Sequence, residues 1–211
     1  MLNGIGNHWK DVHSRTPLVL MLHGPTGTGK NFITEMLAAS MMAEGRDSTF
    51  IHYFTSAYHF QDPAHVKQYA DDLRQWIIGN SSLCNEQLYV FDEAKRFPIG
   101  LLDSLATFFD SGSPFSEKVR RSIFIFLYEG EEPVVRWAVD LYRKGVDRDS
   151  LSLKDAEKVI MPFIMEEKGS MQSSQLVSKG LINYHLPFLP LERKHVRKCI
   201  LDAIQVYSPF L

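Results

Sequence analysis

A glycine-rich loop constrains the fold of this chain more than any other feature of its sequence. The loop fits the pattern G-x-x-x-x-G-K and consists of Gly24, Pro25, Thr26, Gly27, Thr28, Gly29 and Lys30. In this pattern the glycines let backbone N–H groups curl around phosphate oxygens, and the lysine adds a positive charge. An apolar run at 18–22 precedes the loop and a segment with helical spacing follows it. That context is the one the pattern requires, so we expect residues 24–31 to bind a nucleotide.

The residue after the lysine is Asn31, where such loops normally carry Ser or Thr with a hydroxyl that holds Mg²⁺. An amide oxygen can ligate Mg²⁺, but it is neutral and one bond further from the backbone than a hydroxyl. Mg²⁺ tolerates little distortion of its octahedron. Two interpretations therefore stay open: Asn31 ligates the metal directly, or it acts through water while phosphates hold the metal.

Short apolar runs alternate with segments of helical spacing along the chain. The runs predict five buried strands, at 18–22, 50–54, 87–91, 122–127 and 182–189. The helical segments are 31–45, with Phe32 and Met36 on its apolar stripe, 62–80, which we expect to end at Gly79, 97–109 and 133–145. Buried strands that alternate with helices predict a parallel sheet with helices on both faces.

The third apolar run ends in two adjacent carboxylates, Asp92 and Glu93. We expect Asp92, at the tip of the strand, to hold Mg²⁺ through water and Glu93 to polarise the attacking water as the general base. This pair, some 60 residues beyond the loop, indicates the AAA+ ATPase class rather than a nucleotide kinase. We expect the loop strand and the acidic strand to be neighbours. The predicted fold is the large domain of an AAA+ P-loop NTPase, with a five-stranded parallel sheet.

Composition excludes some functions and allows others. The 23 Lys and Arg residues against 25 Asp and Glu residues give a net charge of −2, which argues against a nucleic-acid binder. No apolar run approaches the ~18 residues that a membrane span needs, and no signal peptide is visible at the start. Among other residues, His23 is expected to be packed or capping, Trp76 and Trp137 to lie in the core, and the basic segment 192–199 to be a solvated surface or a partner contact.

Several motifs resemble those of the torsins, the AAA+ ATPases of the endoplasmic reticulum lumen and nuclear envelope. The Lys-Asn pair in HGPTGTGKNF and the segment PFLPLE are the most specific, and FIHYFTSAYHF, LRQWIIGNSSLC, YVFDEAKRF, IFIFL and DLYRKG also match. The resemblance implies ATP and Mg²⁺ as cofactors and weak hydrolysis without an arginine finger of the chain's own. It implies a membrane-anchored luminal activating cofactor of the lamina-associated polypeptide type, and homo- or hetero-oligomers. It also implies a chaperone-like role in that lumen.

Asn80 begins the sequence Asn80-Ser81-Ser82, a glycosylation sequon that fits a luminal glycoprotein. A single such sequon arises often by chance, so its weight comes from the resemblance. We expect residues 1–190 to form the nucleotide-binding domain and 191–211 to begin a C-terminal helical subdomain, which is incomplete in this chain.

One departure from the torsin pattern concerns catalysis directly. Torsins carry Ser-Asn after the fourth strand, and this asparagine, sensor 1, orients the attacking water. Here the sequence reads LYEGEE at 127–132, and no Asn occurs between Asn85 and Asn183. The three glutamates of this segment either bring negative charge near Glu93 and the γ-phosphate, which like-charge repulsion disfavours, or they splay into solvent.

Further departures concern the ends of the chain. Relative to torsins, the sequence lacks the C-terminal Gly-Cys-Lys of the sensor 2 region and the segments before the loop, including the signal peptide. By the resemblance, the missing cysteine would pair with Cys199, so we expect Cys199 to be a free thiol. These departures together predict a fragment, an isoform or a divergent relative.

Three functional hypotheses follow. The first is a torsin-like ATPase that remodels protein or membrane assemblies in the lumen, with Lys30 on the phosphates, Asp92 on the metal and Glu93 on the water. The second is a non-hydrolysing nucleotide switch or interaction module. The intact Glu93 favours the first hypothesis, whereas the missing sensors favour the second. A small-molecule kinase ranks third, because no acceptor-site lid is visible.

Overall fold

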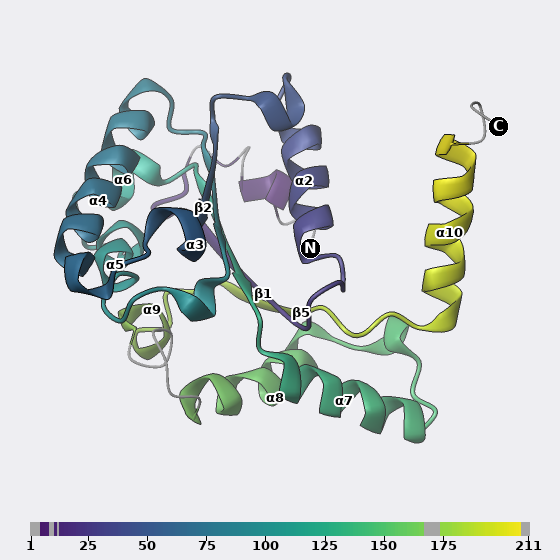
Figure 1. Ribbon diagram of the computed structural model, residues 1–211. Helices are drawn as coiled ribbons and strands as arrows, with labels where there is room; N and C mark the ends of the chain where they lie inside the picture. Colours follow the sequence, from purple (N-terminus) through teal and green to yellow (C-terminus); the bar gives the residue numbers. More distant parts are fainter. Residues whose placement is uncertain (1–4, 9–10, 12, 167–173, 208–211) are drawn as a thin grey trace.

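A five-stranded parallel sheet forms the centre of the molecule in the computed structural model, which describes residues 5–8, 11, 13–166 and 174–207. The strands lie in the order β2-β3-β4-β1-β5, and every pair of neighbours is parallel (Figure 1). Their bounds are β1 Leu18–His23, β2 Ile51–Thr55, β3 Leu88–Asp92, β4 Ile123–Tyr128 and β5 Tyr184–Pro187. The five predicted strands are therefore confirmed.

The two faces of the sheet bury different side chains, because successive residues of a strand point to opposite sides. One face is largely aromatic, and its rings stack from strand to strand: Tyr89 on Phe124 at 4.7 Å between ring centroids, and Phe91 on Phe126 at 4.9 Å. The other face is aliphatic, with residues such as Leu20 from β1. Because the central strands are buried on both faces, they read in the sequence as continuous apolar runs.

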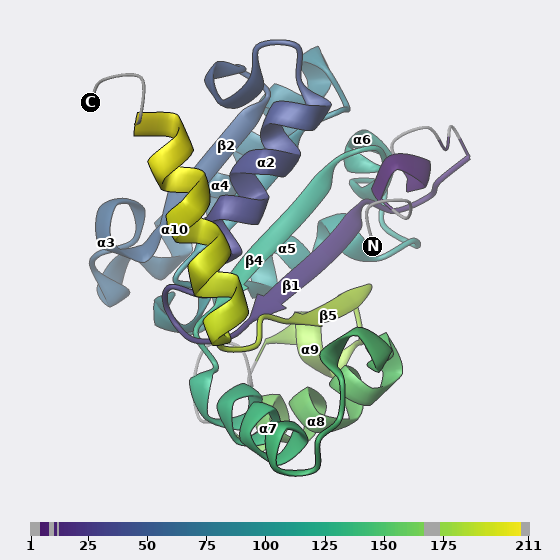
Figure 2. The same cartoon turned by 90° about the vertical axis from the view of Figure 1, so that its right-hand side faces the viewer.

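Helices cover both faces of the sheet. Helix α2 (Lys30–Met41) packs on the aliphatic face, while α4 (Val66–Leu83), α5 (Asp103–Phe109), α6 (Ser116–Val119) and α9 (Gln175–Ser178) lie on the other side (Figure 1, and turned by 90° in Figure 2). The short helix α3 (Ser56–His59) follows β2 directly. This layering is the α/β arrangement that the alternation of strands and helices predicts.

Two helices follow β4 and pack together below the sheet: α7 (Glu131–Arg143) and α8 (Leu153–Glu166). The sequence pattern did not predict α8, which contains Pro162. Proline removes one backbone donor and disfavours a helix interior. The buried side chains of Ala156, Ile160 and Ile164, which recur at four-residue spacing on its core side, are consistent with this helix.

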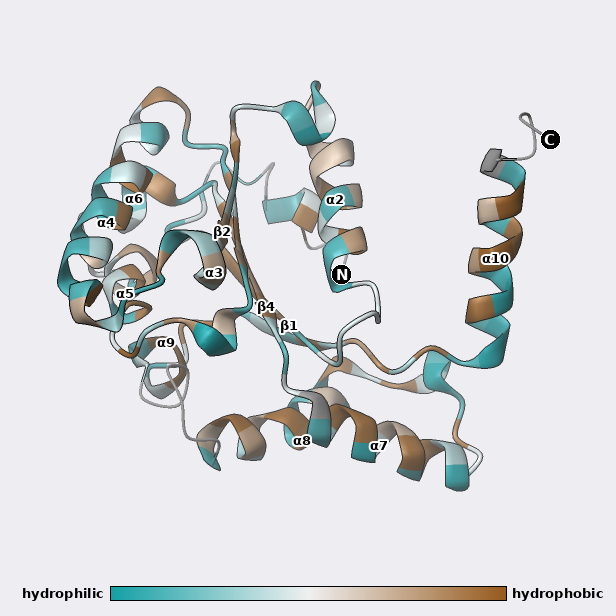
Figure 3. Ribbon diagram, in the orientation of Figure 1, coloured by the Kyte–Doolittle hydropathy of each residue, from teal (hydrophilic) through white to brown (hydrophobic). Residues whose placement is uncertain are grey.

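The last helix, α10 (Arg193–Tyr207), stands apart from the sheet (Figures 1 and 2). Hydrophobic residues interrupt its polar surface in Figure 3. Of these, Val196, Ile200 and Ile204 recur every fourth residue and are 43%, 55% and 57% exposed. The segment 192–199 is therefore exposed but not uniformly basic. The boundary between two domains at residue 190 stays a prediction.

Two predictions about α4 are wrong. The helix does not end at Gly79 but continues to Leu83, since Ile77 and Ser81 on either side of the glycine are buried against the sheet. That burial outweighs the roughly 1 kcal/mol that glycine costs inside a helix. Trp76 is 53% exposed rather than in the core. It overhangs the edge strand β2, where its indole N–H donates to His52 Nδ1 at 3.4 Å.

The predicted apolar stripe of α2 is only partly buried. Leu37 and Ala38 face the sheet, whereas Phe32 and Met36 are 66% and 51% exposed, because they lie on the opposite side of the helix. Phe32 instead lines the pocket described below.

The prediction that the loop strand and the acidic strand are neighbours is also wrong. Strand β4 lies between β1, which carries the glycine-rich loop, and β3, which carries Asp92. The order of strands is set by packing among segments far apart in the chain, so the sequence of one strand does not reveal its neighbour. The segment that begins at Glu129, directly after β4, consequently starts between the loop and the acidic pair.

In the part of the chain that the structure describes, no helix has both the length and the apolar character that crossing a bilayer requires.

Candidate nucleotide-binding site

Most of the predicted nucleotide-site residues line one pocket of about 520 Å³ at the carboxyl ends of the strands: Thr26, Gly27, Gly29, Lys30, Asn31, Asp92 and Glu93. The glycine-rich loop after β1 and the first turn of α2 form one wall. The ends of β2, β3 and β4 form the other, with residues such as Thr55, Asp92 and Glu129. Ligands of open α/β sheets bind in crevices outside the carboxyl ends of the strands, so this is where a nucleotide is expected.

The glycines of the loop are required by its backbone conformation. Gly24 has φ +152°, and a Cβ at this position would lie 2.3 Å from the backbone oxygen of Phe188, so no side chain fits there. Gly29 has φ +96° and is the residue just before α2. This conformation lets the chain turn into the helix with its first N–H groups directed at the pocket, which is a ready anion site.

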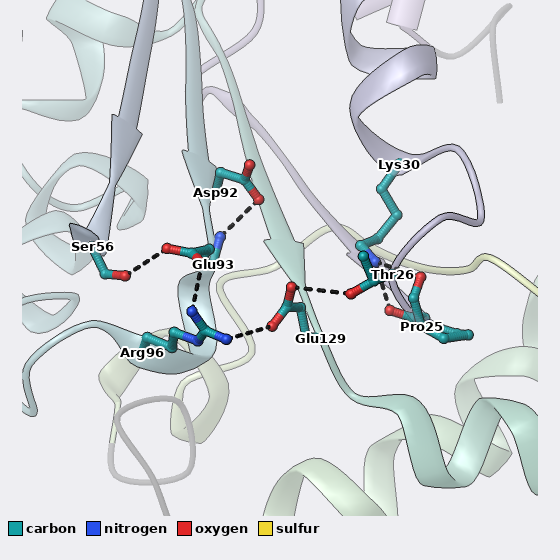
Figure 4. A network of polar contacts seen from close by, with 9 residues as sticks. Pro25, Thr26, Lys30, Ser56, Asp92, Glu93, Arg96 and Glu129 are labelled. Carbon is teal, nitrogen blue, oxygen red and sulfur yellow. Dashed lines mark hydrogen bonds and ion pairs between the residues drawn. The ribbon is translucent and has the colours of Figure 1, made fainter. Parts of the chain in front are cut away.

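Lys30, the first residue of α2, is only 6% exposed. Its Nζ donates to the backbone oxygens of Gly24 at 2.6 Å and of Pro25 at 2.9 Å. The ammonium group thus lies against its own loop (Figure 4). Phosphate oxygens can replace these carbonyl acceptors, because a charge-assisted bond to an anion is stronger than one to a neutral carbonyl.

Asn31 joins the two halves of the pocket. Its side-chain Nδ2 donates to Asp92 Oδ2 at 3.0 Å, and Asp92 Oδ1 accepts the backbone N–H of Glu93 at 2.8 Å. With its N–H₂ group engaged in this way, Asn31 has its amide oxygen available as a neutral metal ligand.

The side chains at the pocket suit Mg²⁺ bound together with phosphates. Among the described residues, no group of three or more His, Cys, Asp or Glu side chains gathers into a metal cage. Mg²⁺ keeps several waters and uses one or two carboxylates plus the phosphates of a substrate. Asp92 supplies such a carboxylate, and Asn31 supplies a neutral oxygen next to it.

Glu93 is held from two sides at the end of β3 (Figure 4). The hydroxyl of Ser56, which follows β2, donates to Glu93 Oε2 at 2.9 Å. The guanidinium of Arg96 donates to Glu93 Oε1 at 2.7 Å. Glu93 is about one-quarter exposed and lines the pocket, so its carboxylate is oriented and still open to solvent.

The segment after β4 brings one of its three glutamates into the pocket. Glu129 Oε1 accepts the hydroxyl of Thr26 in the glycine-rich loop at 3.4 Å, and Oε2 lies 3.8 Å from Arg96 Nη2. Glu132 instead lies on the surface and pairs with Arg136. The side chain of Glu131 falls outside the described residues. Glu129 thus lies in the same pocket as Glu93, while Glu132 lies in solvent; whether Glu129 meets a γ-phosphate stays a prediction.

Sequence reasoning missed two residues that contact Glu93, namely Ser56 and Arg96. Both sit where a signal was available: Ser56 follows the second predicted strand, and Arg96 comes three residues after Glu93. Because all strands are parallel, polar residues that follow any strand gather at the same edge of the sheet.

Two other residues named in the sequence analysis, Asn80 and Cys199, do not line this pocket. Asn80 lies in the last turn of α4, where its Nδ2 donates to the backbone oxygen of Trp76 at 2.9 Å. Its glycosylation stays a prediction. Cys199 is an exposed free cysteine on α10.

A buried histidine pair supports the start of the loop. His23, the last residue of β1, places its Nε2 3.0 Å from Nδ1 of His185 on β5, and its ring also packs edge-on against Tyr128. Burial lowers the pKa of His23 well below its ordinary value of 6.5, with the neighbouring His185 as a further cause. Burial likewise lowers the pKa of His185 to about 4. The expectation that His23 is packed is confirmed.

We expect the fold to lose stability as the pH falls from 6.5 toward 4, before most carboxylates titrate. In this pH window His23 and His185 bind protons in the unfolded chain but stay neutral in the folded one, because burial lowers their pKa values. The unfolded state therefore binds more protons, and a fall in pH favours unfolding. The loss from His185 alone amounts to up to about 3 kcal/mol at pH 4. Urea unfolding at several pH values measures it. The slope between pH 6.5 and 5 should be smaller in His185→Asn, whose side-chain amide can still meet His23; equal slopes would contradict this origin.

Comparisons with known proteins relate this chain to a family. The model of the family described as Torsin matches residues 1–91, which include the glycine-rich loop. A curated "Torsin-like protein" from Caenorhabditis elegans is 38% identical over 202 residues. This match covers 95% of the chain and 57% of the relative, so the chain spans little more than half the length of that protein.

Solved structures of Hsp104 share the fold. The Saccharomyces cerevisiae Hsp104–ADP complex superposes with a TM-score of 0.65 at 13% identity, covering 99% of this chain and 36% of that one. A closed-state reconstruction of Hsp104 with ATPγS and casein gives 0.63 at 13% identity, covering 93% and 33%. At such low identity these matches establish the fold alone, that of an AAA+ P-loop protein.

Proposed function

Because the chain belongs to the torsin family and has the AAA+ fold, we propose that it binds ATP with Mg²⁺ and hydrolyses it slowly. The observation that carries this proposal is the convergence of three elements on one pocket: the glycine-rich loop, Asp92 and Glu93. Each element alone recurs in other contexts, whereas their convergence suits the cleavage of a bound triphosphate.

The proposed chemistry assigns one task to each residue. The backbone of the glycine-rich loop holds the phosphates, and Lys30 turns from its carbonyl partners toward them. Asp92, through water, and Asn31 would hold Mg²⁺, which would neutralise charge on the phosphates. Glu93 accepts the proton of the attacking water, while Ser56 and Arg96 orient its carboxylate.

We further propose that this activity remodels protein or membrane assemblies in the lumen of the endoplasmic reticulum and nuclear envelope. The support is family membership, together with the sequon at Asn80. The proposed partner is a membrane-anchored luminal cofactor of the lamina-associated polypeptide type, which would supply an arginine to the site. Assembly into homo- or hetero-oligomers is part of the same proposal.

A second candidate function is a nucleotide-dependent switch that binds ATP without hydrolysing it. Glu129 supports this alternative, because it lies in the pocket after β4, where torsins carry the sensor asparagine. A carboxylate cannot donate a hydrogen bond to the attacking water or the γ-phosphate as an amide can.

Single-turnover hydrolysis distinguishes the two functions. The chain is mixed in excess with radiolabelled ATP, in the presence of Mg²⁺. The reaction is run once with and once without the luminal domain of the cofactor. The ATPase proposal predicts slow phosphate release that the cofactor accelerates at least tenfold. Binding of ATP without phosphate release in either condition would favour the switch. Failure to bind ATP at all would contradict both.

A further inference from the structure

Glu129, which follows β4, places a carboxylate against the glycine-rich loop. Its carboxylate accepts the hydroxyl of Thr26, the third residue of the glycine-rich loop. This contact bridges the loop and the end of β4 across the mouth of the pocket (Figure 4). Phosphates bound by the loop would therefore approach a carboxylate, in a cradle that otherwise offers N–H groups and a lysine.

The ion pair between Arg96 and Glu129 is a long one, and Arg96 shares its charge with Glu93. The Arg96 guanidinium lies between two carboxylates, and it makes the closer contact with Glu93, at 2.7 Å against 3.8 Å for Glu129. Arg96 thus pairs with both carboxylates, and its shorter ion pair is with Glu93 rather than with Glu129. Glu129 is about one-quarter exposed, so solvent screens it only in part.

The position of Glu129 would bring its carboxylate close to the third phosphate of a bound nucleoside triphosphate. Through Arg96 it is linked to Glu93, the proposed base for water that attacks that phosphate. A third phosphate held by the loop and attacked by water from Glu93 would lie between these two parts of the pocket, which Glu129 and Thr26 also line. A diphosphate lacks this group and leaves the space to the carboxylate.

We propose that Glu129 is a specificity-determining residue that makes the pocket prefer nucleoside diphosphates over triphosphates. A bound triphosphate displaces the Glu129 carboxylate from Thr26 or suffers its repulsion, whereas a diphosphate leaves this contact intact. The inference rests on the proposed function of the pocket as a nucleotide site, and it adds the phosphate length that the site favours.

Titration calorimetry with Mg²⁺ tests the inference by comparing ADP with a non-hydrolysable β,γ-imido analogue of ATP. For the unmodified chain we expect the dissociation constant of ADP to be about tenfold lower. Glu129→Gln keeps an oxygen for the Thr26 hydroxyl and removes the charge. This variant should bind the triphosphate analogue about tenfold more tightly, with ADP affinity changed less than threefold, a magnitude typical of one nearby screened charge.

Glu132→Gln is the matched control, since it removes a charge from the same segment but from an exposed residue paired with Arg136. It should leave the ratio of the two affinities unchanged. The inference is overturned if Glu129→Gln and the unmodified chain show the same ratio, or if both charge removals change it equally. Absence of binding for both nucleotides would overturn the proposed function instead, and this inference with it.

Discussion

Replacing Lys30 by alanine should lower nucleotide affinity at least a hundredfold, which corresponds to about 2.7 kcal/mol of binding free energy. Lys30 is the one cation that the glycine-rich loop itself carries, and its buried position between the loop carbonyls keeps it beside the phosphate cradle. Alanine preserves the first turn of α2 but supplies neither charge nor donor. Equilibrium titration with a fluorescent ATP analogue, with Mg²⁺ present, measures the loss.

The matched control for this variant is Lys67→Ala, which removes an exposed lysine from α4, on the opposite face of the sheet. It should bind the analogue like the unmodified chain. Because Lys30 also ties the loop together through two hydrogen bonds, thermal unfolding of each variant must accompany the titration. A folded Lys30→Ala chain that retains its affinity would refute the assignment of the phosphate loop.

Glu93→Gln should reduce single-turnover hydrolysis at least a hundredfold while it leaves the affinity for ATP within a few fold. The amide has the size and shape of the carboxylate, and its oxygen can still accept the guanidinium of Arg96. Its N–H₂ group would then face Ser56, whose hydroxyl can accept as well as donate. The amide cannot take a proton from water, and general-base catalysis typically contributes 10²–10⁴-fold to the rate. Rapid-quench measurement of phosphate release, in the presence of the activating cofactor, gives the rate.

Two further variants separate the chemistry of Glu93 from its surroundings. Glu117→Gln removes an exposed carboxylate on α6, at the other end of the sheet, and should leave the rate unchanged. Ser56→Ala removes one hydrogen bond to Glu93 and should lower the rate only severalfold, because Arg96 still orients the carboxylate. A Glu93→Gln chain with undiminished turnover would show that another group activates the water.

The strands and the phosphate loop could be predicted from sequence because their signals are local. Each strand lies in a short, largely apolar run, and the loop is set by glycines within seven residues of one another. The helix stripes were less reliable. Trp76 fits a helical spacing but overhangs the edge of the sheet, since β2 is its last strand on that side. Burial at such positions depends on where the sheet ends, which no local pattern contains.

Sequence motifs led to residues that line one pocket, but not to the contacts among them. Asp92, Glu93 and the loop were predicted as site residues, whereas the contact of Glu93 with Ser56 depends on how β2 pairs with β3. The contact with Arg96 is local, three residues along the chain, but it requires the turn that follows β3. The expected adjacency of β1 and β3 was wrong, since it too depends on how the strands pair. Placing β4 between them is what brings Glu129 to the loop, so the order of strands decides which charge the phosphates meet.

The backbone at the end of β3 carries a cost that has a bearing on stability. Among the described residues, Glu93 is the one non-glycine residue with a positive φ, at 56°, a conformation that strains a residue with a long side chain by about 1 kcal/mol or more. Hydrogen bonds fix it on both sides, from its own N–H to Asp92 and from the Arg96 N–H to its carbonyl. Glycine would relax this turn but would bring no carboxylate. The fold therefore holds a strained backbone conformation at the position where the proposed reaction needs a carboxylate.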